Sequence, residues 1–358
     1  MHNEKGGHYK YVFVCGLQRS GTSVLGRNIA RFENCTGFKN TGVLMDEGQF
    51  LQDVYPIDGE FGGAGRFGFD PRAHRTEASK LLTPENVAKL RASWHAYWDP
   101  SKSICVEKTP ANLLMTRFLQ AAFPNSYFVV IMRHPVPVSM ASQRWKVSVS
   151  PIYRLFEHWL HCHKLFEQDK KHLKRVYELR YEDYIENPDK YHQEIAAFIG
   201  TSVPERPKED KFYYVTQWRN PVGVRVPEHA MESTSRAHNE KYFNSWCDLL
   251  KNSPFKHYYR YIAAKYEPEF AKYGYSLTKG LSLKQGHVSE PWGASMAVGP
   301  LYCFMACVSA SAVRFTTRSK GYIKSQIRAR LPQPVKVRIK QFLQRVTPGR
   351  KQPEIVSS

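Results

Sequence analysis

A short apolar run, followed by a turn between two glycines and then a helical pattern, constrains the fold of this chain more than any other feature. Residues 11–15, YVFVC, are apolar, aromatic and β-branched, which predicts a buried strand. Residues 16–23 read GLQRSGTS and lead into apolar positions at helical spacing. Glycines let a ligand approach the backbone, and the first turn of a helix presents N–H groups and a positive dipole end. This strand, turn and helix therefore predict a cradle for an anion.

The cation of this turn separates it from the loop of nucleotide triphosphatases. The spacing G-x-x-x-x-G is the same, but Thr22 stands where those loops carry lysine, and Arg19 lies inside the turn instead. A loop that holds a γ-phosphate with Mg²⁺ needs that lysine and a metal-binding acid at a strand end. A loop that holds one terminal phosphate or sulfate can use a cation in the turn. A purely structural glycine turn is the alternative interpretation.

The charge of the chain predicts an acidic partner. The 358 residues carry a formal net charge of +20, which favours a nucleotide, an anionic glycan, a membrane surface or nucleic acid as ligand. The excess is uneven, because residues 314–358 hold twelve basic residues and one acid. A little over half of the net charge therefore lies in the tail, and the body is only moderately basic.

The seven cysteines are scattered, with neither a CxxC motif nor zinc-ligand spacing, which favours a reducing compartment. Cys15 and Cys105 lie in strand-like runs, so we expect them to be buried free thiols. The first ten residues lack the apolar core of a signal peptide. Together these features predict a cytoplasmic location.

The rest of the body predicts an α/β fold with a parallel sheet. Further strand patterns occur at 103–106, 126–132 and 176–179. They alternate with helical patterns of ten residues or more, which is typical of a parallel sheet covered by helices. The polar residues that end or follow the four predicted strands are Arg19, Lys108, Arg133 and Tyr181. Because the carboxyl ends of parallel strands meet at one edge, where ligands bind, we expect these side chains to share a site.

Helices are predicted at 84–98, 151–172, 188–200 and 246–275. Thr83 precedes Pro84 and is the expected N-cap of the first of them. The glycine-rich segment 59–68 is predicted to be a surface loop and a candidate substrate lid. Segment 229–243 is a candidate closing element over a bound nucleotide.

The predicted domains are an α/β body over 9–281 and a basic C-terminal extension over 282–358. Residues 291–313 contain no charged side chain and have the length of a membrane span, but their glycine, proline, serine and alanine make them only mildly apolar. The segment has two interpretations: a membrane span or membrane-dipping hairpin, or a packed or disordered segment. The basic residues after it favour an anionic membrane surface or a solvated tail.

Four motifs, in this order and at these intervals, resemble the sulfotransferase family: GLQRSGTS, VEKTPANLL, VVIMRHPVPVS and LRYEDYIENP. They span residues 11–200 and lie nearer to the tyrosylprotein and carbohydrate branches than to the branch that acts on small phenols. The resemblance implies a P-loop-like three-layer α/β fold with a central parallel sheet. It also implies 3′-phosphoadenosine 5′-phosphosulfate (PAPS) as the donor, a hydroxyl acceptor and no nucleic acid partner.

The resemblance also implies roles for single residues. The residues expected to bind the 5′-phosphosulfate are Arg19, Ser20, Gly21, Thr22 and Ser23. Arg133 would bind the 3′-phosphate, Tyr181 would lie near the adenine, and Lys108 would stabilise the bridging oxygen. The family usually carries a serine eight residues after that arginine, where this chain has Ala141, so Ser139 or Ser142 is expected to take the role.

An acceptor hydroxyl needs a general base within reach. Glu47 resembles the acid of the tyrosylprotein branch, Asp46 is the alternative, and a plain surface acid is the other interpretation. His134 follows a residue assigned to phosphate, so we expect it to be structural. A monoanionic sulfuryl group has less charge to neutralise than a phosphoryl group, so no metal is expected.

Three functions remain in competition on the sequence alone. The first is metal-independent, in-line sulfuryl transfer to a carbohydrate, protein tyrosine or lipid-linked hydroxyl. The second is a P-loop kinase or triphosphatase, which Thr22 and the absent metal acid oppose. The third is a non-catalytic, basic glycan- or membrane-binding module that has kept the fold.

Overall fold

The computed structural model describes residues 9–144, 150–205, 235–278 and 295–310. Its centre is a five-stranded sheet in the order β2-β3-β1-β4-β5, in which every neighbouring pair is parallel. The strands are β1 Lys10–Gly16, β2 Cys35–Gly37, β3 Ile104–Lys108, β4 Ser126–Met132 and β5 Val176–Arg180. The α/β class and the central parallel sheet are thus confirmed.

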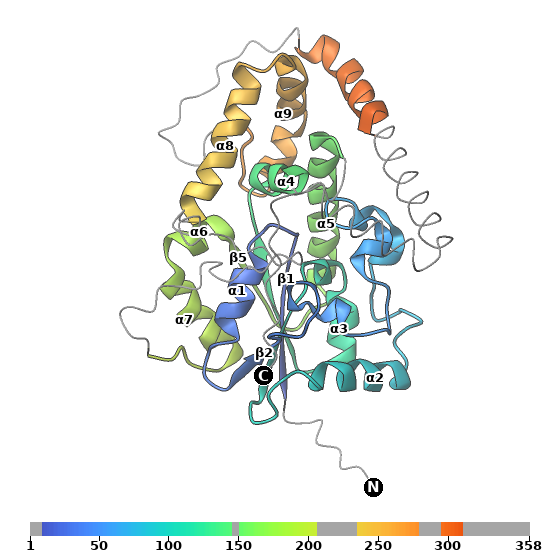
Figure 1. Cartoon of the computed structure of the whole chain (residues 1–358), viewed down its shortest axis with the longest axis vertical. Coiled ribbons are helices and arrows are strands. Elements are labelled where there is room, and N and C mark those ends of the chain that lie inside the picture. Colours follow the sequence, from blue (N-terminus) through green and yellow to red (C-terminus); the bar gives the residue numbers. More distant parts are fainter. Residues whose placement is uncertain (1–8, 145–149, 206–234, 279–294, 311–358) are drawn as a thin grey trace, which may run out of the picture. The chain divides into compact units, whose positions relative to one another are not determined.

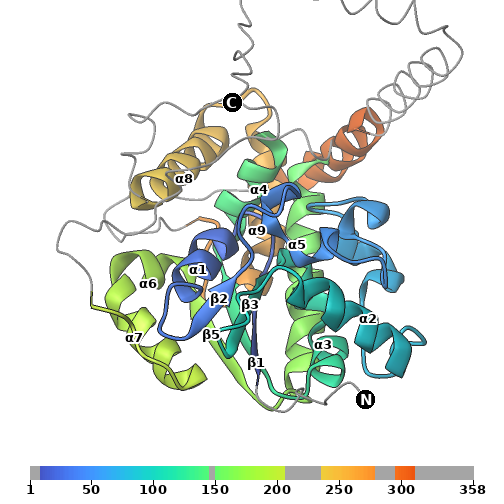
Figure 2. The same ribbon diagram turned by 60° about the horizontal axis from the view of Figure 1, so that its bottom comes forward.

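Helices cover both faces of the sheet (Figures 1 and 2). One face carries α1 Thr22–Ile29, α6 Tyr181–Glu186 and α7 Pro188–Ile199, and the other carries α2 Pro84–His95, α3 Thr116–Ala122 and α5 Ile152–Lys170. The remaining helices of the body are α4 Pro135–Arg144, α8 Ser235–Lys251 and α9 Lys256–Ala271. Thr83 caps α2 as predicted, because its Oγ1 accepts a hydrogen bond of 3.2 Å from the N–H of Asn86.

The strand β1 is buried on both faces, which explains its unbroken apolar run. Val12 and Val14 belong to the core under α1 and α7. Phe13 points to the opposite face, where its ring packs against Trp94 and Phe123 at centroid distances of 6.1 and 5.5 Å. Burial of such side chains contributes about 1.5–3 kcal/mol each and fixes β1 at the middle of the sheet.

The parallel order brings the ends of β1, β3, β4 and β5 to one edge, called the carboxyl edge below. Lys108 ends β3, Arg133 and Tyr181 directly follow β4 and β5, and Arg19 lies in the turn after β1. The predicted gathering of these residues at one edge is therefore confirmed.

Several expected elements differ in the structure. The pattern over 246–275 is not one helix, because the chain leaves the helix at Lys251 and re-enters it at Lys256, around a proline at 254. The segment 59–68 is not simply a surface loop, since Phe67 and Gly68 are buried and the Gly68 N–H donates to His158 Nε2 at 3.1 Å. The strand β2 was missed, because three residues give no periodic signal.

The predictions for Cys15 and Cys105 are confirmed, whereas other predictions concern residues outside the described part of the chain. Cys15 and Cys105 are buried and free, as expected. Of segment 229–243, residues 235–243 begin α8, and the earlier ones are not described. The expected boundary at 281/282 also lies outside the described residues and stays a prediction.

The chain divides into two compact units, 1–305 and 306–358, and all the elements above belong to the first. Residues 295–310 are helical, and the rest of segment 291–313 is not described. No helix in the described part of the chain combines the length and apolarity that a membrane crossing requires.

Candidate functional site

The turn between β1 and α1 has the backbone geometry of an anion cradle. Arg19 and Gly21 both have positive φ, at 74° and 97°, and the turn is closed by a 3.0 Å hydrogen bond from Ser20 N to Leu17 O. Within the described residues no side chain caps the N-terminus of α1, so its first N–H groups point to the carboxyl edge without a capping partner. Ser20 Oγ is buried there with no hydrogen-bond partner among the described residues.

Arg133 and Tyr181 adjoin this turn. Arg133 Nη1 donates a 2.6 Å hydrogen bond to the carbonyl of Arg19, and its guanidinium lies 4.3 Å from the centre of the Tyr181 ring. A Cβ on Gly21 would come within 2.5 Å of that ring, so only glycine fits there. Arg133 therefore contacts both the backbone of Arg19 and the Tyr181 ring, and Gly21 of the turn lies against the same ring.

Burial changes the electrostatics of the turn. Desolvation lowers the pKa of Arg19 from its ordinary value and nearby Arg133 lowers it further, while Tyr242 and Glu47 act in the opposite direction. Tyr242 comes from α8, so part of the segment expected to close over the nucleotide does lie near the turn. An anion between the two arginines would relieve their repulsion.

The two candidate serines on α4 differ in their environment. Ser142 Oγ donates a 2.7 Å hydrogen bond to Val138 O in the preceding turn of its own helix. Ser139 is buried, and its Oγ has no hydrogen-bond partner in the part of the chain that the structure describes. Both serines line a small cavity beside Leu17 and Gln18 of the turn. Ser139 is therefore the serine whose hydroxyl remains available to a ligand.

Lys108 and Glu47 form a buried ion pair at the end of β3. Lys108 Nζ lies 2.9 Å from Glu47 Oε1 and 3.3 Å from the Met45 carbonyl oxygen. Gln49 Nε2 donates to the other carboxylate oxygen of Glu47 at 2.8 Å. Both residues are less than a tenth exposed, so this is a pair whose partners depend on each other rather than a solvated surface contact.

The loop before Glu47 decides which of two neighbouring acids faces the site. Met45 and Asp46 both have positive φ, at 58° and 50°, which bends the chain sharply. The Asp46 carboxylate turns back to accept hydrogen bonds from Thr41 N and Thr41 Oγ1, at 2.8 and 2.6 Å. The structure thus brings Glu47, but not Asp46, to Lys108.

A chain of polar contacts links Glu47 to the β1–α1 turn. Gln49, which donates to Glu47, accepts a 3.0 Å hydrogen bond from the N–H of Asp58 on its Oε1. The Asp58 carboxylate in turn accepts from Gln18 Nε2, at 2.6 Å. Burial, and then the nearby Glu47, raises the pKa of Asp58 to about 6. Sequence reasoning missed Asp58 and Gln49, because nothing local distinguishes a buried loop acid from an exposed one.

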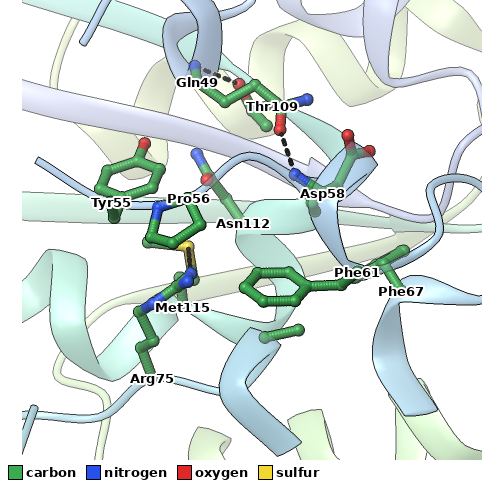
Figure 3. A pocket seen from close by; sticks show the side chains of 12 residues that line it. Gln49, Tyr55, Pro56, Asp58, Phe61, Phe67, Arg75, Thr109, Asn112 and Met115 are labelled. Carbon is green, nitrogen blue, oxygen red and sulfur yellow. Dashed lines mark hydrogen bonds between the residues drawn. The ribbon is translucent and has the colours of Figure 1, made fainter. Parts of the chain in front are cut away.

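Figure 3 shows the pocket beside this chain of contacts. Gln49 bridges Thr109 and Asp58 on one wall, and Arg75 points toward Met115 on another, with its Nη1 3.3 Å from the sulfur. The Arg75 guanidinium also lies over the rings of Tyr55 and Phe61, at 5.6 and 5.3 Å. Segment 58–73 is therefore anchored to the site by a buried cation that sequence reasoning did not identify.

Glu107 fixes the backbone around Glu47 and the residues after β3 through hydrogen bonds. Its Oε1 accepts from Gly48 N at 2.9 Å and from Thr109 Oγ1 at 2.5 Å, and its Oε2 accepts from Asn112 Nδ2 at 2.6 Å. A Cβ on Gly48 would meet Glu107 Oε1 at 2.7 Å, so this carboxyl fixes the backbone directly after Glu47. An acid directly after the apolar residues 104–106 was the signal in the sequence that could have identified it.

The titration of Glu107 gives a testable pH dependence. Burial raises its pKa from 4.5 to about 7, while the hydrogen bonds from Thr109 and Gly48 oppose the rise. Between these pH values the unfolded chain has lost the proton and the folded chain keeps it, so the free energy of unfolding falls as the pH rises. Glu107→Gln removes this titration. We expect the difference between the free energies of unfolding of wild type and Glu107→Gln to fall by about 3 kcal/mol between pH 4 and pH 8, with wild type losing stability.

Denaturant unfolding at the two pH values measures this difference, and Glu85→Gln, which changes an exposed carboxyl on α2, is the control. The same pH slope for wild type and Glu107→Gln would show that Glu107 does not hold its proton in the folded protein.

His134 has a structural role, as expected. Its Nε2–H donates to Ser276 O at 2.9 Å, its Nδ1 accepts from Val136 N at 3.2 Å, and burial lowers its pKa to about 4. It is therefore a neutral ring with both nitrogens occupied. Among the described residues no three His, Cys, Asp or Glu side chains form a group that could hold a metal ion.

Comparisons with known proteins agree with the resemblance noted in the motifs. The model of the sulfotransferase family matches residues 12–205, more than half of the chain. No curated protein matches.

Several solved structures resemble the chain at low identity. The sulfotransferase domain of the Synechococcus PCC 7002 olefin synthase is 17% identical, with 66% of this chain and 89% of that chain covered and a TM-score of 0.42. The sulfotransferase domain of the curacin biosynthetic pathway is 15% identical, with coverages of 72% and 97% and a TM-score of 0.40. A sulfotransferase from Mycobacterium tuberculosis is 16% identical, with coverages of 55% and 69% and a TM-score of 0.36.

Proposed function

We propose that this chain, which belongs to the sulfotransferase family, transfers a sulfuryl group from PAPS to a hydroxyl acceptor. The observation that carries the proposal is the contact of Arg133 with the β1–α1 turn, through the Arg19 carbonyl and the Tyr181 ring. A nucleotide with anionic groups at both its 3′ and 5′ positions needs two cations of this kind at one sheet edge.

The residues present suit such a donor. The uncapped first turn of α1, with Arg19, would hold the 5′-phosphosulfate, and the buried Ser20 hydroxyl would gain the partner it lacks. Arg133 and the buried hydroxyl of Ser139 would hold the 3′-phosphate. Tyr181, which already lies against Gly21 and Arg133, would pack near the adenine.

The ion pair of Lys108 and Glu47 would supply the chemistry. Lys108 would neutralise the bridging oxygen of the donor as its bond to sulfur breaks, and Glu47 would take the proton of the acceptor hydroxyl as the new O–S bond forms. The products are the sulfated acceptor and 3′,5′-adenosine bisphosphate. When Lys108 turns to the donor, the Oε1 atom of Glu47 becomes free to accept from the acceptor hydroxyl, while Gln49 still holds Oε2.

Two further proposals concern the chain's surroundings. The seven cysteines, free in the structure, suit the cytoplasm, and the basic residues after 313 suit an anionic membrane surface.

The function is tested with isotopically labelled PAPS and a mixed library of glycan, peptide and lipid acceptors, read by mass spectrometry. We expect label in at least one hydroxyl acceptor without added Mg²⁺, and binding of 3′,5′-adenosine bisphosphate by isothermal titration. Turnover of ATP with Mg²⁺ instead would identify a kinase or triphosphatase. Nucleotide binding with no turnover on the whole library would identify a non-catalytic module.

A further inference from the structure

A cleft of about 510 Å³ runs along α1 on the side of β2 and β3. Its walls come from α1, from β2 with the loop that follows it, and from the end of β3; the cations among its lining residues are Arg27, Arg31, Lys39 and Lys108. Figure 2 shows α1 beside β2 and β3 at this place. The volume lies in the range of about 300–1,000 Å³ that is typical of ligand sites. We call it the α1 cleft.

The helix α1 presents one face to this cleft. Ser23 and Arg27 are four residues apart, and Arg31 follows four residues later, just beyond the last turn of the helix. On the same side, a Cβ on Gly26 would come within 2.9 Å of Lys108 Cβ, so α1 lies directly on the end of β3. A row of cations therefore leads along the cleft from Lys108, the cation of the proposed chemistry.

The two acids of the cleft, Asp46 and Asp99, offset only part of this charge. Asp46 accepts two hydrogen bonds from Thr41. Asp99 accepts two from Ser101, at 2.9 and 2.7 Å. Both carboxylates thus stabilise their own turns but keep their negative charge. Because Lys108 is paired with Glu47, the other three cations, Arg27, Arg31 and Lys39, exceed these two acids by one, and this excess favours an anionic ligand.

The strand order places this cleft away from Arg133 and Tyr181, and only Ser23 and Lys108, at the 5′-phosphosulfate end of the proposed nucleotide site, also line it. Arg133 and Tyr181 follow β4 and β5, on one side of β1, whereas Lys108 and the cleft belong to β3 and β2, on the other. A donor bound through Arg133 and the β1–α1 turn would leave the α1 cleft open, with Lys108 in its lining and Glu47 2.9 Å from Lys108.

We infer that the α1 cleft binds the acceptor, and that the acceptor is an anionic glycan whose carboxylate or sulfate groups pair with Arg27 and Arg31. This inference rests on the proposed function. Guanidinium groups bind such anions in a bidentate manner, and Thr36 and Asn40, which also line the cleft, offer hydrogen bonds to sugar hydroxyls. A peptide that added a strand to the sheet would find only the three residues of β2 at this edge.

The test measures binding, so it does not require turnover. The probes are a fluorescein-labelled chondroitin decasaccharide without sulfate, its carboxyl-reduced form, and an oligoglutamate of equal charge, each with 3′,5′-adenosine bisphosphate present. The variant is Arg27→Gln with Arg31→Gln. The matched control is Lys171→Gln with Lys174→Gln, which removes two exposed cations before β5, at the opposite edge of the sheet.

We expect the cleft variant to bind the charged glycan about tenfold more weakly than wild type by fluorescence anisotropy, and the control variant to bind it as wild type does. The carboxyl-reduced glycan should bind wild type at least as weakly as the charged glycan binds the cleft variant. Equal losses in the two variants, or none in the cleft variant, would overturn the inference, and so would tighter, cleft-dependent binding of oligoglutamate.

Isothermal titration with 3′,5′-adenosine bisphosphate separates this inference from the proposed function. Nucleotide binding should be unchanged in the cleft variant, which also reports correct folding. Wild type that binds the glycan but not the nucleotide would refute the proposed donor and leave the cleft assignment standing.

Discussion

Arg133→Ala is expected to weaken the binding of 3′,5′-adenosine bisphosphate by about 30-fold or more, because a charge-assisted contact to phosphate contributes about 1.5–3 kcal/mol. The guanidinium also supports the β1–α1 turn through the Arg19 carbonyl, so its loss affects both ends of the proposed nucleotide site. Arg133→Lys should lie between wild type and alanine, since lysine keeps the charge but loses the planar stack on Tyr181. Isothermal titration measures all three affinities.

Arg175→Ala is a closely matched control for this measurement. Arg175 lies 4.3 Å from the centre of the Tyr127 ring, the same distance as Arg133 from Tyr181, and it also donates to a backbone carbonyl, that of Ser126 at 3.0 Å. It sits at the opposite edge of the sheet, where β4 and β5 begin. Nucleotide affinity should therefore be unchanged in Arg175→Ala. Wild-type affinity in Arg133→Ala would exclude the proposed nucleotide site.

Glu47→Gln and Lys108→Ala are each expected to lower kcat by on the order of 10²–10⁴-fold, since one removes the proposed base and the other the cation on the leaving oxygen. Nucleotide affinity should change little in Glu47→Gln, because Glu47 is proposed to contact only the acceptor, whereas Lys108→Ala should weaken it, because Lys108 is proposed to contact the 5′-phosphate oxygen. The double variant should be little slower than the slower single variant, because residues that act as a unit give non-additive losses. Steady-state rates with labelled donor test both points.

Asp46→Asn distinguishes the two neighbouring acids. Its carboxylate is bound to Thr41, so we expect this variant to lose stability and to keep most of its kcat. Full activity in Glu47→Gln together with a large loss in Asp46→Asn would reverse the assignment of the base.

The sequence was most informative where strand, turn and helix follow one another directly. The run 11–30 predicts a buried strand, a glycine turn and a helix, and each is local enough for side-chain type and spacing to determine it. The edge position of Lys108, Arg133 and Tyr181 followed from a general rule about parallel strands, without knowledge of any contact.

The features that the sequence did not reveal depend on contacts between distant segments. Gln18 meets Asp58 forty residues away, and Arg75 becomes buried only because Met115 and two aromatic rings surround it. The proline at 254 indicates a break in the helical pattern over 246–275. The apolar periodicity continues on both sides of it, so the pattern still favoured one helix. Periodicity reports which face of a segment is buried, and not which partner buries it.

The central position of β1 in the sheet affects the order in which nucleotide and acceptor can bind and leave. If nucleotide and acceptor reach the reacting groups from opposite sides of one strand, spent nucleotide can leave and a fresh molecule can enter while the acceptor stays bound. A polymer held in this way can shift along its groove between exchanges and receive several modifications during one residence. The sheet order β2-β3-β1-β4-β5 thus makes processive action on a long chain geometrically accessible.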